Sequence, residues 1–231
     1  MKAGALVKTT LIDYPGHIAS VVFCQGCPWR CPFCHNPELV VPECMELAIP
    51  DDVIFRELVN QKGSVDAVVL SGGEILMQRD VTDWVARIHA MGLKVKIDTN
   101  GYYPDRLREL LAKEPPDYVA MDIKTDAAGY DKLVGKKGSI GRVRESISIL
   151  TSSGVDHEFR TTLLEGYHLP SRLLRLFELV PMASRYFLQA YRPAPASVGD
   201  WSGYEATSPD FMRLAERLAK DFGLCVRVRN L

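Results

Sequence analysis

Apolar strand-like runs alternate with amphipathic helix-like runs along this 231-residue chain, and this alternation limits the fold more than any other feature. Repeated strand–helix units favour a parallel sheet, because parallel neighbours need a long crossover connection. Strands are predicted at residues 18–23, 67–70, 93–97, 118–121, 157–163, 186–188 and 225–228. Helices are predicted at residues 81–91, 105–112, 142–152, 171–180 and 208–221, the last capped by Ser208 with Pro209 at its first position.

About six or seven βα units fit this pattern, too few for the eight units of a closed barrel. The predicted fold class is therefore α/β, a partial, laterally open (βα)6-type parallel barrel. No linker, repeat or low-complexity segment interrupts the chain. We therefore expect a single domain over residues 1–231, with its core at about 16–229.

Three cysteines with the spacing C-x-x-x-C-x-x-C follow the first of these strands: Cys27, Cys31 and Cys34. Loops after strands carry the chemistry in βα folds. Three thiolates can hold a four-iron cluster and leave one iron without a protein ligand, whereas electron-transfer clusters usually have four. Pro28 and Pro32 discourage regular structure, so this loop can wrap around a cluster.

Other interpretations of the cysteines stay open at this level. Cys24 forms a C-x-x-C pair with Cys27, so zinc or a redox dithiol are alternatives. Zinc motifs usually have a second pair of ligands further along the chain, and none follows here. Cys24 also fits as the last residue of its strand. The isolated Cys44 and Cys225 are predicted to be small buried hydrophobic residues.

Polar residues and glycines follow three further strands. Gly72-Gly73-Glu74, Asp98-Thr99-Asn100 and the pair Asp122 and Lys124 each come directly after an apolar run. This shared placement predicts one site. Glycines let the backbone approach a ligand closely, although a plain turn is the alternative. Carboxylates from adjacent strands could hold a cation, while Lys124 could also be a surface lysine.

These motifs resemble those of the radical S-adenosylmethionine (SAM) superfamily. An aromatic residue, Phe33, precedes the last cysteine of the triad, and Ser71-Gly72-Gly73-Glu74 resembles the Gly-Gly-Glu motif of that superfamily. Asp98-Thr99-Asn100-Gly101 and Asp122-Ile123-Lys124 resemble strand-end motifs of enzymes that activate glycyl-radical enzymes. Ile75 stands where the family often has proline, which leaves the shape of that turn open.

Three further segments resemble the activating proteins of anaerobic ribonucleoside-triphosphate reductase: Leu11 to Gly16 (LIDYPG), Cys34 to Glu38, and Arg160-Thr161-Thr162. The resemblance extends from about Leu11 to Arg229. It implies a barrel of the radical SAM kind and an oxidoreductase that cleaves SAM reductively to a 5′-deoxyadenosyl radical. This radical would generate a glycyl radical on a partner enzyme, with the anaerobic reductase as the expected partner and a flavodoxin or ferredoxin as the electron donor.

The resemblance also implies a role for each candidate residue. Cys27, Cys31 and Cys34 would bind a [4Fe-4S] cluster with one open iron, and Asp98, Thr99 and Asp122 would help to bind a monovalent cation. The residues expected to contact or surround SAM are Phe33, His35, Gly72, Gly73, Glu74, Asn100, Asp122, Lys124, Arg160 and Gln189. An internal salt bridge for Arg160 and an ordinary loop position for His35 are the alternatives. No acid–base catalyst is expected, because the cofactors carry the chemistry.

Composition excludes several other functions. A net charge of −1 without a clear basic stripe gives no support for binding nucleic acid. No apolar run approaches the roughly 20 residues of a membrane span and no signal peptide is visible, so we expect a cytoplasmic protein with reduced thiols. Two rival functions remain: a radical SAM enzyme for a small molecule of the deazapurine type, and a non-catalytic zinc-binding module. Ser202-Gly203-Tyr204 is predicted to be an ordinary turn.

Overall fold

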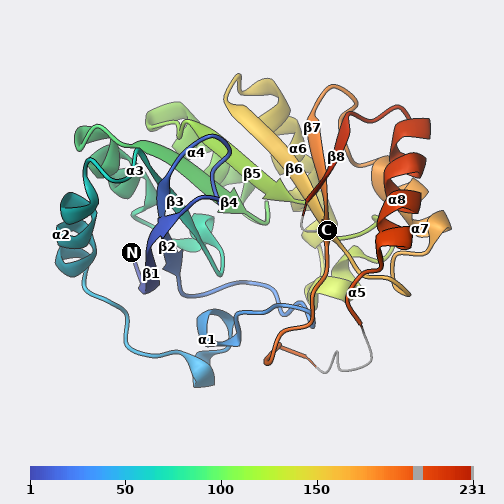
Figure 1. Ribbon diagram of the computed structural model, residues 1–231, viewed down its shortest axis with the longest axis horizontal. Helices are drawn as coiled ribbons and strands as arrows, with labels where there is room; N and C mark the ends of the chain where they lie inside the picture. Colours follow the sequence, from blue (N-terminus) through green and yellow to red (C-terminus); the bar gives the residue numbers. More distant parts are fainter. Residues whose placement is uncertain (200–204, 230–231) are drawn as a thin grey trace.

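One curved eight-stranded sheet forms the centre of the computed structural model, which describes residues 1–199 and 205–229 (Figure 1). The strands lie side by side in chain order: β1 (Ala3–Thr10), β2 (Ala19–Cys24), β3 (Ala67–Gly72), β4 (Lys94–Thr99), β5 (Tyr118–Asp122), β6 (Asp156–Leu163), β7 (Arg185–Ala190) and β8 (Val226–Arg229). Strands β2 to β8 are parallel, and β1 pairs with β2 in the antiparallel direction. β1 and β8 are the two edges of the sheet, so the predicted partial, open barrel is confirmed.

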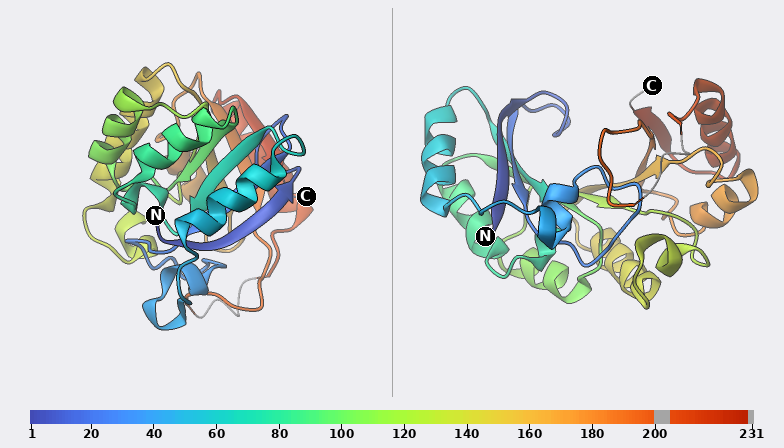
Figure 2. Two further views of the ribbon diagram at one scale, coloured as in Figure 1. Left: turned by 90° about the vertical axis from the view of Figure 1, so that its left-hand side faces the viewer. Right: turned by 90° about the horizontal axis from the view of Figure 1, so that it is seen from below.

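Helices cover the outer face of the curved sheet (Figure 2, right). We call the space on its concave inner side the lumen of the partial barrel. The helices that follow strands are α2 (Asp51–Gln61), α3 (Val81–Ala90), α4 (Pro104–Lys113), α6 (Ser139–Ser152), α7 (Pro170–Phe177) and α8 (Pro209–Asp221). Shorter elements are α1 (Pro37–Val40), α5 (Tyr130–Val134) and the 3-10 turns η1 (Pro42–Cys44) and η2 (Ile75–Met77). None of the helices in the described ranges is long and apolar enough to cross a membrane.

The strands are apolar on both faces, as expected for a parallel sheet that is covered on one side and curled on the other. In β3, Val68 and Leu70 belong to the large core under the helices, whereas Ala67 and Val69 belong to a small cluster inside the lumen. Side chains of successive residues point to opposite faces of a strand, which explains this division. Small residues on the inner face leave room for the polar groups described below.

The LIDYPG segment connects β1 to β2 at the end of the sheet away from the cysteines. Tyr14 is 4% exposed, and its ring lies 5.6 Å from that of Tyr118, the first residue of β5. Tyr14 therefore fills the lumen at the amino ends of the parallel strands. The LIDYPG segment, one of the three that resemble the activating proteins, therefore has a packing role in the structure. It lies at the opposite end of the strands from the cysteines.

The seven parallel strands and five helices predicted from the sequence are confirmed, with ends shifted by a few residues. The edge strand β1 and the helices α1, α2 and α5 were missed. Ser208 caps α8 as predicted, since its Oγ accepts a hydrogen bond from the backbone N–H of Phe211 at 3.2 Å. The predicted turn at Ser202-Gly203-Tyr204 lies outside the described residues.

Candidate active site

A cavity of about 280 Å³ lies at the carboxyl ends of the parallel strands and collects almost all of the predicted site residues. Those that line it are Cys27, Cys31, Phe33, Cys34, His35, Gly72, Gly73, Glu74, Asp98, Thr99, Asn100, Asp122, Lys124 and Arg160. Gln189 does not line this cavity. Six further residues complete the lining: Trp29, Asn36, Val40, Ser71, Thr162 and Tyr191. The sequence analysis gave none of them a role in the site, although Asn36, Ser71 and Thr162 lie within the motifs that it quoted.

The cysteine segment, by which we mean residues 26–34, is fixed by backbone hydrogen bonds to three other parts of the chain. Gly26 accepts from the N–H of Glu74 at 2.8 Å, and Arg30 donates to Val134 O at 2.9 Å. Cys34 O accepts from the N–H of Val198 at 3.1 Å. A loop held from three sides keeps its side chains in place, so the three sulfurs line one wall of the cavity.

Trp29 anchors the same segment in the core. It is 1% exposed, its Nε1 donates to Ser139 Oγ at 3.1 Å, and its ring contacts those of Tyr102 and Tyr130. A buried indole needs a partner for its N–H, and Ser139 supplies one from the start of α6. Trp29 therefore ties the cysteine segment to the helix layer.

Burial raises the pKa of the Cys27 thiol and raises that of Cys31 to about 12. Lys124 partly offsets the shift at Cys31. The Asn100 side chain donates to Cys27 Sγ at 3.6 Å. Three sulfurs on one wall fit a cluster as ligands, and at Cys27 and Cys31 binding of iron would replace the protons that burial keeps on the thiols.

Cys24 is different from the triad. It is fully buried in the core at the end of β2 and does not line the cavity, as the strand interpretation predicted. The prediction for Cys44 and Cys225 was wrong, because both thiols are exposed. Cys44 lies in the short turn η1 and Cys225 immediately precedes the edge strand β8, and neither place has a covering layer.

The two glycines at the end of β3 allow this strand to approach the cysteine segment. A Cβ on Gly73 would lie 2.2 Å from Gly26 O, and one on Gly72 would lie 2.3 Å from Cys24 N. Gly72 also has a φ of 119°, which favours glycine. The sequence analysis expected these glycines to let a ligand approach the backbone closely. In the structure, the backbone of Cys24 and Gly26 makes this close approach.

Glu74 joins this turn to the end of β4. It is 1% exposed, and its carboxylate accepts hydrogen bonds from Thr99 Oγ1 at 2.6 Å, from Asn100 N at 2.7 Å and from Leu76 N at 3.0 Å. Burial raises its pKa to about 7 in spite of these donors. Glu74 therefore positions the strand ends that line the cavity.

A charged network occupies the opposite wall. Arg160 Nε donates to Asp122 Oδ1 at 2.9 Å, and its NH1 lies 3.5 Å from Asp98 Oδ1. Lys124 Nζ donates to Asp122 Oδ2 at 2.9 Å. Burial alone would raise the pKa of Asp122, but Arg160 and Lys124 hold it at about 2. The internal salt bridge considered for Arg160 is present, and its guanidinium also lines the cavity.

Lys96 was missed by the sequence analysis and belongs to the same network. Only 1% of it is exposed, and its Nζ donates to Asp98 Oδ1 at 2.5 Å. Lysine is rarely buried without a partner, so its position two residues before Asp98 on the same strand face is explained by this pair. A lysine that alternates with apolar residues is typical of the solvent-exposed side of an ordinary strand, so its burial could not be predicted from the sequence.

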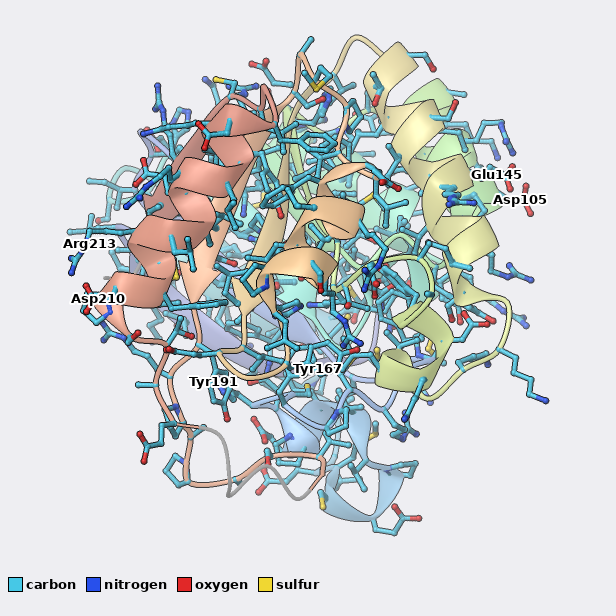
Figure 3. All side chains as sticks on the ribbon, turned by 90° about the vertical axis from the view of Figure 1, so that its right-hand side faces the viewer. Asp105, Glu145, Tyr167, Tyr191, Asp210 and Arg213 are labelled. Carbon is cyan, nitrogen blue, oxygen red and sulfur yellow. The ribbon has the colours of Figure 1, made fainter. Side chains whose placement is uncertain are left out.

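Aromatic rings close the cavity beside the cysteines. Phe33 is 7% exposed, with Lys124 Nζ 5.9 Å from its ring centre. The His35 ring lies 5.3 Å from that of Tyr191, which follows β7. Tyr191 is labelled in Figure 3. Burial lowers the pKa of His35, so its imidazole is neutral near pH 7. This wall offers flat, apolar surface that suits a planar ring.

His168 supports the network from behind. It is fully buried, its Nδ1 accepts from Leu164 N at 2.9 Å, and its Nε2 donates to Lys124 O at 3.1 Å. Burial lowers its pKa to about 4, and the hydrogen bond to Lys124 O opposes this shift. Smaller contributions come from Arg172, which lowers the pKa, and from Asp126, which raises it. His168 therefore fixes the backbone of Lys124 while it stays neutral.

The sequence profile of the radical SAM superfamily matches residues 21–173 of the chain. This chain therefore belongs to the radical SAM superfamily, whose members are enzymes that use a [4Fe-4S] cluster and SAM. The matched range contains the cysteine segment and the ends of β3 to β6, which build most of the cavity.

Named relatives point to one branch of the superfamily. A protein of Methanocaldococcus jannaschii with the provisional name of glycyl-radical enzyme activating enzyme is 28% identical over 238 residues, covering 100% of this chain and 98% of the relative. The pyruvate formate-lyase 1-activating enzyme of Escherichia coli is 34% identical over 170 residues, covering 68% of this chain and 65% of the relative. Streptococcus suis SuiB bound to S-adenosylmethionine shares the fold, with a TM-score of 0.71, 16% identity, and coverage of 91% of this chain and 50% of SuiB.

Replacement of Gly73 by alanine tests the contact between β3 and the cysteine segment. We expect Gly73→Ala to lower the free energy of unfolding by about 2 kcal/mol, because the added methyl group forces Gly26 to move. The iron retained after anaerobic reconstitution should fall as well. Gly141→Ala on α6 is the control, since no atom lies within 4 Å of its added Cβ. Equal effects of the two changes in urea unfolding and iron content would contradict this account.

The depressed pKa of His168 predicts a pH dependence of stability. The unfolded chain binds a proton at His168 near pH 6.5, whereas the folded chain does so only near pH 4. The contribution of His168 is therefore fully present above about pH 6.5 and is lost as the pH falls toward 4, by about 3 kcal/mol in total. In urea unfolding, His168→Gln should show a shallower decline over this range. Parallel curves for the wild type and the variant would reject the assignment.

Proposed function

We propose that this enzyme activates a glycyl-radical enzyme by forming a glycyl radical on a backbone Cα of its partner. The observation that carries the proposal is the convergence of the cysteine triad, the Gly72-Gly73-Glu74 turn and the charged network on one cavity of an open sheet. The relatives named as activating enzymes of glycyl-radical enzymes support the same branch. An open sheet can admit a loop of another protein to the carboxyl ends of its strands.

Cys27, Cys31 and Cys34 would hold the cluster, which supplies one electron to break a carbon–sulfur bond of SAM and release methionine and a 5′-deoxyadenosyl radical. The protein's own residues would orient the cofactor. Lys124 and Arg160 present positive charge to its carboxylate, and the turn at Gly72 and Gly73 would bind its amino group. Phe33 and His35 would lie against the adenine, with Asn100 close to Cys27. Gln189 would contact the ribose, and this is the one assignment without support from the cavity lining.

The anaerobic ribonucleoside-triphosphate reductase is the partner that we propose, on the motifs around Tyr14, Cys34 and Arg160. Pyruvate formate-lyase is the competing partner, since activating enzymes named for it are among the relatives. The experiment is to incubate reconstituted enzyme, SAM and dithionite with each partner and to measure the glycyl radical by electron paramagnetic resonance. A radical on the reductase alone supports the proposal. Hydrogen transfer only from a small metabolite would favour the rival radical SAM function.

We propose that the electron comes from an acidic flavodoxin or ferredoxin that docks beside Cys27. This cysteine also lines a second cavity of about 720 Å³ with Lys2, Arg30 and Arg79 at its edge. Within the described part of the chain, none of these three cations pairs with a carboxylate, whereas Asp80 in the same cavity pairs with the N-terminal ammonium. The basic surface continues over Tyr102, where Lys136 and Arg142 stack. Opposite charge speeds the association of a carrier protein.

Alanine substitutions in the triad test the cluster ligands. Cys27→Ala, Cys31→Ala and Cys34→Ala should each abolish formation of 5′-deoxyadenosine with dithionite as reductant, because an incomplete ligand set cannot hold the cluster. Cys24→Ala should retain it, since Cys24 is buried away from the cavity. The product is measured by chromatography. Cleavage of SAM by any triad variant would reject the ligand assignment.

Charge reversal tests the docking surface. A Lys2→Glu/Arg79→Glu variant should slow cluster reduction by flavodoxin hydroquinone about tenfold at low salt, because steering by opposite charge is lost. Reduction by dithionite, a small reagent that needs no docking, should stay unchanged. The matched control is Lys62→Glu/Arg217→Glu, which changes two exposed cations without ion pairs on other faces of the described chain. Stopped-flow absorbance follows both reactions, and an unchanged rate with flavodoxin would remove this surface from the proposal.

A further inference from the structure

The carboxylates at the ends of β4 and β5 are already neutralised by the protein's own cations. Asp98 accepts from Lys96 Nζ at 2.5 Å and from Ser71 Oγ at 3.2 Å, with Arg160 NH1 at 3.5 Å. Both oxygens of Asp122 are used as well, by Arg160 and Lys124. The oxygens expected to bind a monovalent cation are thus all engaged with side chains.

Thr99, the third expected ligand, faces a different neighbour. Its hydroxyl donates to Glu74 Oε1 at 2.6 Å, and the hydroxyl oxygen accepts from Gly101 N at 3.1 Å. Adjacent side chains of a strand point to opposite faces, so the Thr99 hydroxyl is directed toward Glu74 and not toward the Asp98 carboxylate, although both residues line the cavity. The side chains of Asp98, Thr99 and Asp122 therefore do not fit an external cation as a common ligand set.

We propose that the ammonium of Lys96 replaces an external monovalent cation in this site, so that the enzyme binds SAM without K⁺ or Na⁺. This proposal rests on the proposed function, because it concerns the recognition of SAM. Lys96 acts through Asp98 and is a positioning residue. No motif named above contains it.

Charge balance supports this assignment. Lys96, Lys124 and Arg160 carry three positive charges, and Asp98 and Asp122 carry two negative ones, which leaves one positive charge within this network of five side chains. The Glu74 carboxyl lines the same cavity but lies outside this network and accepts from Leu76, Thr99 and Asn100 instead. A site with the same residues but a neutral side chain in place of Lys96 would need one bound cation to reach that charge. The residual positive charge matches the carboxylate of the methionyl group of SAM, an anion that is favoured by a cationic wall.

Burial shields the Lys96–Asp98 pair from solvent. The Lys96 side chain is 2% exposed and that of Asp98 is 15% exposed, so solvent ions screen the pair poorly. Lys96 also lies below Asp98, nearer to the middle of β4, because it precedes Asp98 by two residues on the same face. An ammonium there can hold Asp98 in place while Arg160 and Lys124 remain on the cavity wall to meet the ligand.

The test measures the dissociation constant of SAM for the cluster-loaded, unreduced enzyme by equilibrium dialysis. The buffers contain K⁺, Na⁺ or tetramethylammonium, which is too large to replace a bare monovalent ion. The wild type should bind SAM equally well in all three. Lys96→Met should bind about tenfold more weakly in tetramethylammonium and recover in K⁺ or Na⁺, since one charge is missing and a small ion can restore it.

Two further variants separate charge from folding. Lys96→Arg keeps the charge and should stay independent of the cation, whereas Lys94→Met, an exposed lysine on the same strand, should behave as the wild type. Cation dependence of the wild type would overturn the proposal even if Lys96→Met does not fold. A Lys96→Met variant that binds weakly in every buffer would also overturn it, because the lysine would then be structural. Failure of the loaded wild type to bind SAM in all buffers would instead overturn the proposed function together with this inference.

Discussion

The close backbone contact between the end of β3 and the cysteine segment is the constraint on which the site depends. The N–H groups of Gly73 and Glu74 donate to the carbonyls of Cys24 and Gly26, and only glycine at position 73 leaves room for this contact. Glu74 then reaches across to Thr99 and Asn100 at the end of β4. The sulfur wall, the turn and the next strand end are thus one connected unit.

The sequence predicted the positions of the site residues well, because strand ends can be recognised from apolar runs and parallel strands place those ends at one edge. Prediction from the sequence failed where the position of a residue in its strand or loop did not reveal its hydrogen-bonding partner. Lys96 and His168 look like ordinary polar residues of a strand and a loop. Only the folded chain shows that Lys96 is buried against Asp98, and His168 against the backbone of Leu164 and Lys124. The edge strand β1 was missed because its half-exposed residues lack the apolar run of a central strand.

The local charge of the folded surface also could not be predicted from the sequence. A net charge of −1 gave no sign of a basic surface, yet Lys2, Arg30 and Arg79 meet beside Cys27 although they are far apart in the chain. In the same way, the LIDYPG segment was recognised only as a family motif, and the structure shows that its Tyr14 closes the far end of the lumen. Family motifs show which residues matter, and the fold decides whether they act in chemistry or in packing.

Burial also protects two of the ligand thiols, those of Cys27 and Cys31, before the chain receives iron. A thiol with a raised pKa carries little thiolate, and thiolate is the form that attacks disulfides and reacts with oxidants. Newly made protein that meets air would therefore keep Cys27 and Cys31 reduced for longer than the exposed Cys44 and Cys225. The first disulfides would then link molecules through these surface thiols, before Cys27 and Cys31 are oxidised.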